Sequence, residues 1–142
     1  MYAETIERVL SQMVLLSGLL VGFSFTGIAT LLAMREGSRT ASATIAAFLT
    51  AATLLLYAAI VGAVTLAYPL ETLSTAQFTR LGRMYPFLQW PFRLGLLGFL
   101  SGIGLVGWIR SRRLGMVSTS LALAACAGWV AWAGLLRALF GR

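Results

Sequence analysis

Long apolar runs without charged residues dominate the pattern of hydrophobic and polar positions along this chain. Three runs are long enough to cross a bilayer, and a fourth, shorter run extends back past Arg93. A membrane helix needs about 20 apolar residues, at about 1.5 Å of rise each, to cross a hydrocarbon layer roughly 30 Å thick. The pattern predicts an all-α integral membrane protein of one domain, residues 1–142, whose transmembrane helices cover about residues 9–34, 41–68, 88–110 and 114–138.

Short polar segments arrange these four predicted helices as two helical hairpins. The sequence REGSR, residues 35–39, joins the first two helices, and its Gly37 is a natural helix stop. The sequence RSRRLG, residues 110–115, joins the last two. We therefore expect each hairpin to turn tightly just outside the membrane.

The segment between the hairpins predicts a short helix of a different kind. Ser74 followed three residues later by Gln77 matches a capping box, which marks a helix start. Residues 75–84 then place apolar side chains at steps of three and four residues, apart from the arginines. We expect an amphipathic helix here that lies flat at the membrane interface. Pro86 should end it.

Small residues recur along one face of the predicted membrane helices. Lipid tails are as apolar as leucine, so membrane helices associate through close van der Waals contact, which small residues permit. Packing within the chain is the favoured interpretation, and contact with another subunit remains the alternative. The predicted packing or interface residues are Gly18, Gly22 and Thr26 on the first helix and Gly95, Gly98 and Gly102 on the third.

Residues 26–48 and 101–123 align without gaps and share several identities, among them Gly27 with Gly102. Such matches arise from a duplicated hairpin or by chance in membrane sequence of low complexity. The alignment leaves both origins open.

The composition agrees with a membrane protein, because 59% of residues are hydrophobic and 11% charged, with a mean hydropathy of +0.88. A net charge of +7 would suggest nucleic-acid binding in a soluble protein. Here the arginines cluster at helix ends, where they can contact lipid phosphates, so we expect no nucleic-acid partner. The arginines at the hairpin tips are Arg35, Arg39, Arg110, Arg112 and Arg113.

Location and orientation follow less directly from the charges. All basic residues are arginine, which is typical of a GC-rich genome, and we expect a multi-pass protein of a prokaryotic plasma membrane. Five arginines lie close together at the hairpin tips, and six are spread over longer segments on the opposite side. The positive-inside rule therefore favours cytoplasmic hairpin tips only slightly.

Arg93 is the one charge that the pattern sets apart. Only 16 uncharged residues separate it from Arg110, about 24 Å of helix, which is short of the bilayer thickness. Arg93 must therefore lie at or just below one interface. The favoured interpretation is a side chain that snorkels to phosphate, and the alternative is a guanidinium that binds an anionic headgroup, a solute or a partner's carboxylate.

Residues that usually carry chemistry are scarce in this sequence. There is no histidine and only one cysteine, and none of the four acidic residues falls inside a predicted span. These absences exclude the usual ligands for haem, iron–sulfur and zinc, and they remove the carboxylate on which most proton-coupled transporters depend. We expect no cofactor, no metal and no enzymatic activity.

The sequence thus predicts a non-catalytic four-helix membrane subunit, an accessory or scaffold component whose partners are membrane lipids and either further copies of itself or other membrane proteins. The alternative is an oligomeric pore or small transporter for an anion or a neutral solute. Both predictions require assembly through helix faces rather than through soluble domains.

Overall fold

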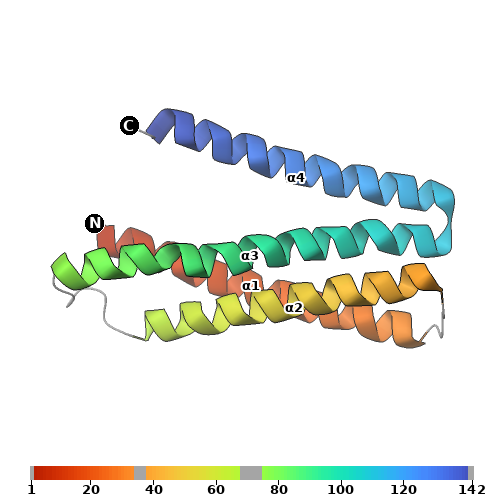
Figure 1. Cartoon of the computed structure of the whole chain (residues 1–142), viewed down its shortest axis with the longest axis horizontal. Coiled ribbons are helices and arrows are strands. Elements are labelled where there is room, and N and C mark those ends of the chain that lie inside the picture. The colour runs from red at the N-terminus through yellow and green to blue at the C-terminus, as the bar shows by residue number, and fades with distance from the viewer. Residues whose placement is uncertain (1, 34–37, 68–74, 141–142) are drawn as a thin grey trace.

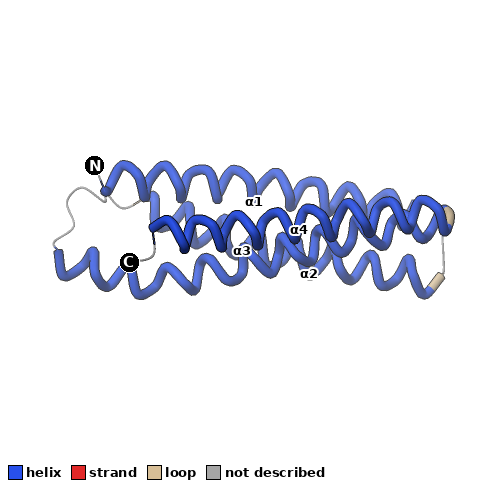
Figure 2. The backbone as a smooth tube through the Cα atoms, turned by 90° about the horizontal axis from the view of Figure 1, so that it is seen from above, coloured by secondary structure: helices blue, strands red, loops and turns tan. Residues whose placement is uncertain are grey.

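Four long α-helices run side by side along one axis (Figures 1 and 2). The structure is a computed structural model that describes residues 2–33, 38–67 and 75–140, without the side chains of residues 2–6, 75–76, 78–86, 88, 129–130 and 132–140. The helices are α1 (Tyr2–Ala33), α2 (Arg39–Leu66), α3 (Thr75–Arg110) and α4 (Arg112–Phe140).

Three helices are long and apolar enough to cross a membrane. They provide the spans Glu7–Ala33, Arg39–Leu66 and Gln89–Arg110. This indicates a multi-pass membrane protein. The fourth helix, α4, covers the last predicted span, but many of its side chains lie outside the described part, so the arrangement of four spans in two hairpins stays a prediction.

The expected break between an interfacial helix and the third span is wrong. Helix α3 continues from Thr75 to Arg110 through both Pro86 and Pro91, so no separate helix lies flat over residues 75–84. A proline inside a helix removes one backbone donor and can kink the helix without ending it. Pro91 lies within the span Gln89–Arg110, where a continuous helix keeps backbone groups paired, and Pro86 precedes that span. With 36 residues, α3 is about 54 Å long, and it extends past the end of α2 (Figure 1). Ser74, the predicted cap, lies outside the described residues.

Two serines define the helix starts at the hairpin end. Ser38 precedes α2, and its side chain accepts a hydrogen bond of 3.1 Å from the Ala41 N–H. Ser111 alone separates α3 from α4, and its Oγ accepts a bond of 3.2 Å from the Leu114 N–H. Serine is a strong N-cap residue because it satisfies one unpaired amide of the first turn. The second hairpin loop is therefore shorter than the segment 111–113 that separates the predicted helices.

Helix α2 is the centre of the assembly. Among the described residues the extensive interfaces join consecutive helices, with a minor contact between α1 and α3. Buried positions of α2 alternate in steps of three and four residues, as in a coiled coil, over the whole helix. The positions in this series are Ala41, Thr44, Phe48, Ala51, Leu55, Ala58 and Gly62, and Ala52 is buried beside it. The facing line on α1 repeats every seven residues and consists of Leu10, Ser17, Ser24 and Leu31.

Phe48 fills the space where α1, α2 and α3 meet. Its side chain is only 4% exposed. A Cβ added at Gly27 would lie 3.1 Å from Phe48 Cε2, and one added at Gly102 would lie 2.7 Å from Phe48 Cε1. The ring also packs against Phe99 at a centroid distance of 5.9 Å. One phenyl ring thus occupies the room left by two glycines on two neighbouring helices.

We expect Phe48→Ala to destabilise the protein strongly. The substitution would leave a cavity between three helices, which costs about 3–5 kcal/mol in well-packed cores. Thermal unfolding in mild detergent, followed by circular dichroism, measures the effect. The matched control is Leu49→Ala, since Leu49 is 53% exposed and adjacent in sequence. Equal losses in the two variants would mean that Phe48 does not hold the helices together.

Candidate functional site

The glycines predicted on α3 pack against α2. A Cβ at Gly95 would approach Leu55 Cγ to 2.8 Å, and a Cβ at Gly98 would approach the Cβ of Ala51 to 3.3 Å. Together with Gly102 against Phe48, these contacts form one continuous line. The absence of side chains lets the two backbones approach closely, which is how small residues stabilise helix pairs in lipid.

The glycines predicted on α1 are placed differently. A Cβ added at Gly18 or Gly22 would have no neighbouring atom within 4 Å. Thr26 is also exposed, and its hydroxyl donates to the Gly22 carbonyl at 2.9 Å. The within-chain packing that the sequence favoured is therefore not found at Gly18 and Gly22 in the described part of the chain. This line of small residues faces away from the other helices.

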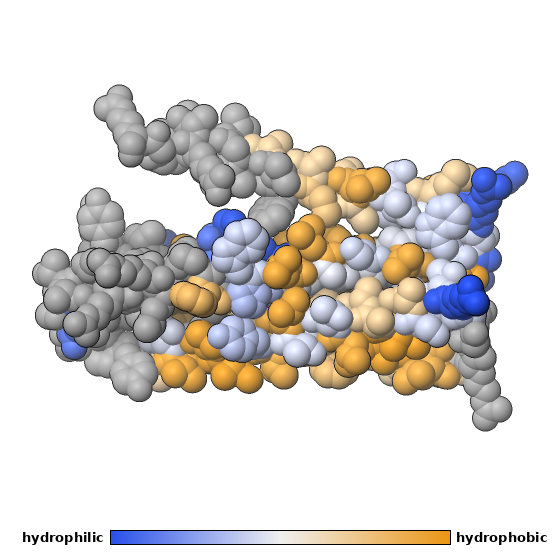
Figure 3. All heavy atoms as spheres, in the orientation of Figure 1, coloured by the Kyte–Doolittle hydropathy of each residue, from blue (hydrophilic) through white to orange (hydrophobic). Residues whose placement is uncertain are grey.

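The arginines predicted to contact lipid gather at one end of the molecule. Arg39, Arg110, Arg112 and Arg113 are exposed at the hairpin tips, where Figure 3 shows strongly hydrophilic residues; Arg35 lies outside the described residues. Arg110 is in the last turn of α3, where a cation is favourable. Arg112 and Arg113 begin α4, where the helix dipole opposes them.

Arg93 is separate from this group. It lies within the third span and is partly buried, whereas the described tip arginines are exposed. Arg93 is far from the hairpin tips along α3, and its place at a membrane interface stays a prediction.

The side-chain hydrogen bonds between α3 and α4 were not predicted from the sequence. Trp108 Nε1 donates to Thr119 Oγ1 at 2.9 Å, and Ser118 Oγ donates to the Gly104 carbonyl at 2.9 Å. Gly107 and Gly115, placed symmetrically about Ser111, admit Ser118 and Trp108 respectively. The equal spacing of these two glycines from Ser111 is the sequence feature that could have indicated the contacts. The side chains of Trp108 and Ser118 thus join the two helices.

Ser17 is a buried polar residue without a hydrogen-bond partner among the described contacts. Its side chain is fully buried on the face of α1 that packs toward α2. Ser24, one heptad along the same face, donates to the Leu20 carbonyl at 2.9 Å. An unpaired buried hydroxyl typically costs about 1–3 kcal/mol. Ser17 is therefore a local weakness in the α1–α2 interface.

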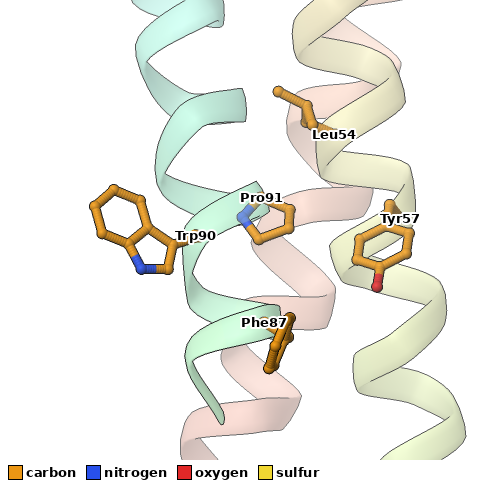
Figure 4. Close-up of a pocket in the computed structure, with 5 residues that line it drawn as sticks. All are labelled: Leu54, Tyr57, Phe87, Trp90 and Pro91. Carbon is orange, nitrogen blue, oxygen red and sulfur yellow. The ribbon is translucent and has the colours of Figure 1, made fainter. Parts of the chain in front are cut away.

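A shallow groove opens between α2 and α3 (Figure 4). It has a volume of about 620 Å³, and its lining is apolar apart from one hydroxyl and one indole N–H. Phe87 and Pro91 turn toward α2, Trp90 points away from it, and α1 lies behind the groove. The lining residues are Leu54, Tyr57, Phe87, Trp90 and Pro91.

The described side chains contain no group of three or more histidine, cysteine, aspartate or glutamate residues that could hold a metal ion. Cys126 is a free, partly buried thiol on α4. The surfaces that remain for function are the α1 line of small residues, the arginines and the α2–α3 groove.

We expect Gly98→Ile to lower the thermal stability of the detergent-solubilised protein much more than Gly18→Ile. The first side chain would collide with Ala51, whereas the second would enter open space. Melting curves of both variants and of wild type test this difference. Equal destabilisation would show that the α3 line is no closer to its neighbour than the α1 line.

We expect Ser17→Ala to leave stability unchanged or to raise it by up to about 1 kcal/mol, because it removes an unpaired hydroxyl. Thr44→Ala is the control, since Thr44 is equally buried and its hydroxyl donates to the Thr40 carbonyl. Destabilisation by Ser17→Ala to the same extent as by Thr44→Ala would reveal a partner for Ser17.

Comparison with known proteins adds no assignment to this geometry: no protein-family model, no curated protein and no solved structure matches the chain.

Proposed function

We propose that this chain is a non-catalytic subunit of a membrane complex, which assembles with itself or with other membrane proteins in the plasma membrane of a prokaryote. The observation that supports the proposal best is the outward-facing line of small residues on α1. Among the described residues, Gly18 and Gly22 have open space above them, as has Gly128 on α4, whereas the three predicted glycines of α3 pack against α2.

This line has the properties of a helix-docking surface. Leu19 and Phe25, each more than half exposed, lie three residues to either side of Gly22 and flank the gap that it leaves. The exposed hydroxyls are already bonded within α1, since Thr26 donates to Gly22 and Thr30 donates to Thr26. Another helix could therefore approach closely without leaving a polar group unpaired.

The alternative function, an oligomeric pore or small transporter for an anion or a neutral solute, requires the same assembly. The two functions differ in the assembly that they require. A pore requires a closed ring of identical chains, whereas an accessory subunit requires a fixed stoichiometry with larger partners. Mass spectrometry of the complex, extracted gently from its native membrane, distinguishes these outcomes directly.

We expect Gly22→Ile to reduce assembly while the individual chain stays folded. The larger side chain would hold the partner helix away over several turns, but it has no neighbour within the chain. The measurement is the fraction of protein in the complex, by native mass spectrometry, together with the melting temperature.

The control for that measurement is Leu49→Ile, which alters an exposed side chain on α2. Normal assembly of Gly22→Ile would show that the α1 line of small residues is not the docking surface. A homogeneous ring without other subunits would favour the pore.

A further inference from the structure

The groove between α2 and α3 lies at a definable depth in the membrane. Leu54 and Tyr57 are 15 and 18 residues from Arg39 along α2, about 22 and 27 Å from the hairpin end. Trp90 is 20 residues from Arg110 along α3, about 30 Å from the same end. Since bilayer hydrocarbon is about 30 Å thick, the groove crosses the boundary opposite the hairpin tips.

The groove exposes aromatic side chains to an unusual extent. Phe87 is 73% exposed, Trp90 59% and Tyr57 50%. Tyrosine and tryptophan favour the headgroup boundary because each combines an apolar ring with a polar group. Leu54, at the deep end, is wholly apolar. The lining side chain at the deep end is therefore apolar, and those nearer the membrane boundary include polar groups. This matches the change from acyl chain to headgroup along a phospholipid.

Arg93 adds a positive charge beside this groove. It follows Trp90 by three residues, so the two side chains are neighbours on the surface of α3. Side chains on a helix tilt toward its N-terminus, which directs Arg93 toward Trp90 and the nearby membrane boundary. Its Cα is about 25 Å from the hairpin end, and its long side chain can reach phosphate depth.

None of the five described lining residues is acidic, so the described lining offers no carboxylate to the ammonium group of a zwitterionic lipid. A guanidinium pairs well with phosphate through two parallel hydrogen bonds. Charge complementarity therefore favours a lipid with net negative charge. The volume of about 620 Å³ is within the range of about 300–1,000 Å³ that is typical of small-molecule sites.

We propose that this groove binds one anionic phospholipid. The upper part of an acyl chain lies against Leu54 and Pro91, and the phosphate is held by Arg93. Trp90 and Tyr57 lie at headgroup depth beside it. The site does not depend on assembly through α1, so its test is independent of the proposed subunit function.

The test uses Trp90 as the only fluorescent tryptophan, in a variant carrying Trp108→Phe, Trp129→Phe and Trp132→Phe. The protein is reconstituted into phosphatidylcholine vesicles that contain one brominated lipid, either phosphatidylglycerol or phosphatidylcholine. The bromine atoms are on the part of the acyl chain nearest the headgroup. Bromine quenches tryptophan at close contact. At equal mole fractions we expect brominated phosphatidylglycerol to bind near Trp90 about fivefold more strongly than brominated phosphatidylcholine, because one basic side chain supplies a preference of this size at a membrane surface.

Substitutions then assign the preference to Arg93. Arg93→Gln should abolish it, while Arg93→Lys should retain most of it because the charge remains. Arg112→Gln, which removes an equal charge at the hairpin end, should leave it unchanged. Circular dichroism of each variant confirms that the helices are intact.

Equal quenching of Trp90 by the two brominated lipids would overturn the proposal, as would a preference that survives Arg93→Gln. Shielding of Trp90 from both lipids would also overturn it, because a protein surface would then cover the groove.

Discussion

The packing of Phe48 between two glycines is the contact on which the three-helix core depends. In lipid, an apolar side chain gains little by leaving one apolar environment for another, so helices associate only where their surfaces fit closely. Gly27 on α1 and Gly102 on α3 supply the room, and the Phe48 ring of α2 fills it from both sides. The fit sets both the spacing and the register of the neighbouring helices. The Gly98–Ala51 and Gly95–Leu55 contacts continue the same register toward the other end of α2.

The surfaces that this core leaves uncovered have distinct characters. On α1 the line through Gly18 and Gly22 is narrow and flanked by large side chains, a shape that accepts another helix. Between α2 and α3 the groove at Trp90 is broad, aromatic and near a positive charge, a chemistry that accepts a lipid. Helix α4 is held to α3 by the Trp108–Thr119 and Ser118–Gly104 hydrogen bonds near the hairpin end. The surface proposed for assembly and the groove proposed for lipid thus lie on separate faces of the same core.

Among the described buried side chains, the Ser17 hydroxyl alone lacks a hydrogen-bond partner. Most hydroxyls on the spans donate to the carbonyl four residues earlier, as Ser24 and Thr44 do. Local bonds of this kind make serine and threonine compatible with an apolar environment while keeping their small volume for packing. Ser17 lacks such a bond and marks the point where the α1–α2 interface is least satisfied.

Much of the fold followed from the sequence alone, because the length of an apolar run limits what it can form. The apolar runs determined that the chain is helical, and their length made three helices capable of spanning a bilayer. The small-residue positions also identified the faces that allow close approach. The expected helix end at Pro86 was wrong, since a proline inside a helix removes one hydrogen bond and can kink the helix without ending it.

Only the tertiary structure decided which small-residue faces are used. Gly22 and Gly98 belong to the same kind of motif, yet one faces open space and the other packs on Ala51. The difference is the rotation of each helix about its axis, which long-range contacts such as Phe48 with Gly102 determine. The groove beside Trp90 also requires two helices, because its sides come from residues more than 25 positions apart in the chain. A periodic pattern specifies a face of one helix, but the partner of that face depends on how all the helices fit together.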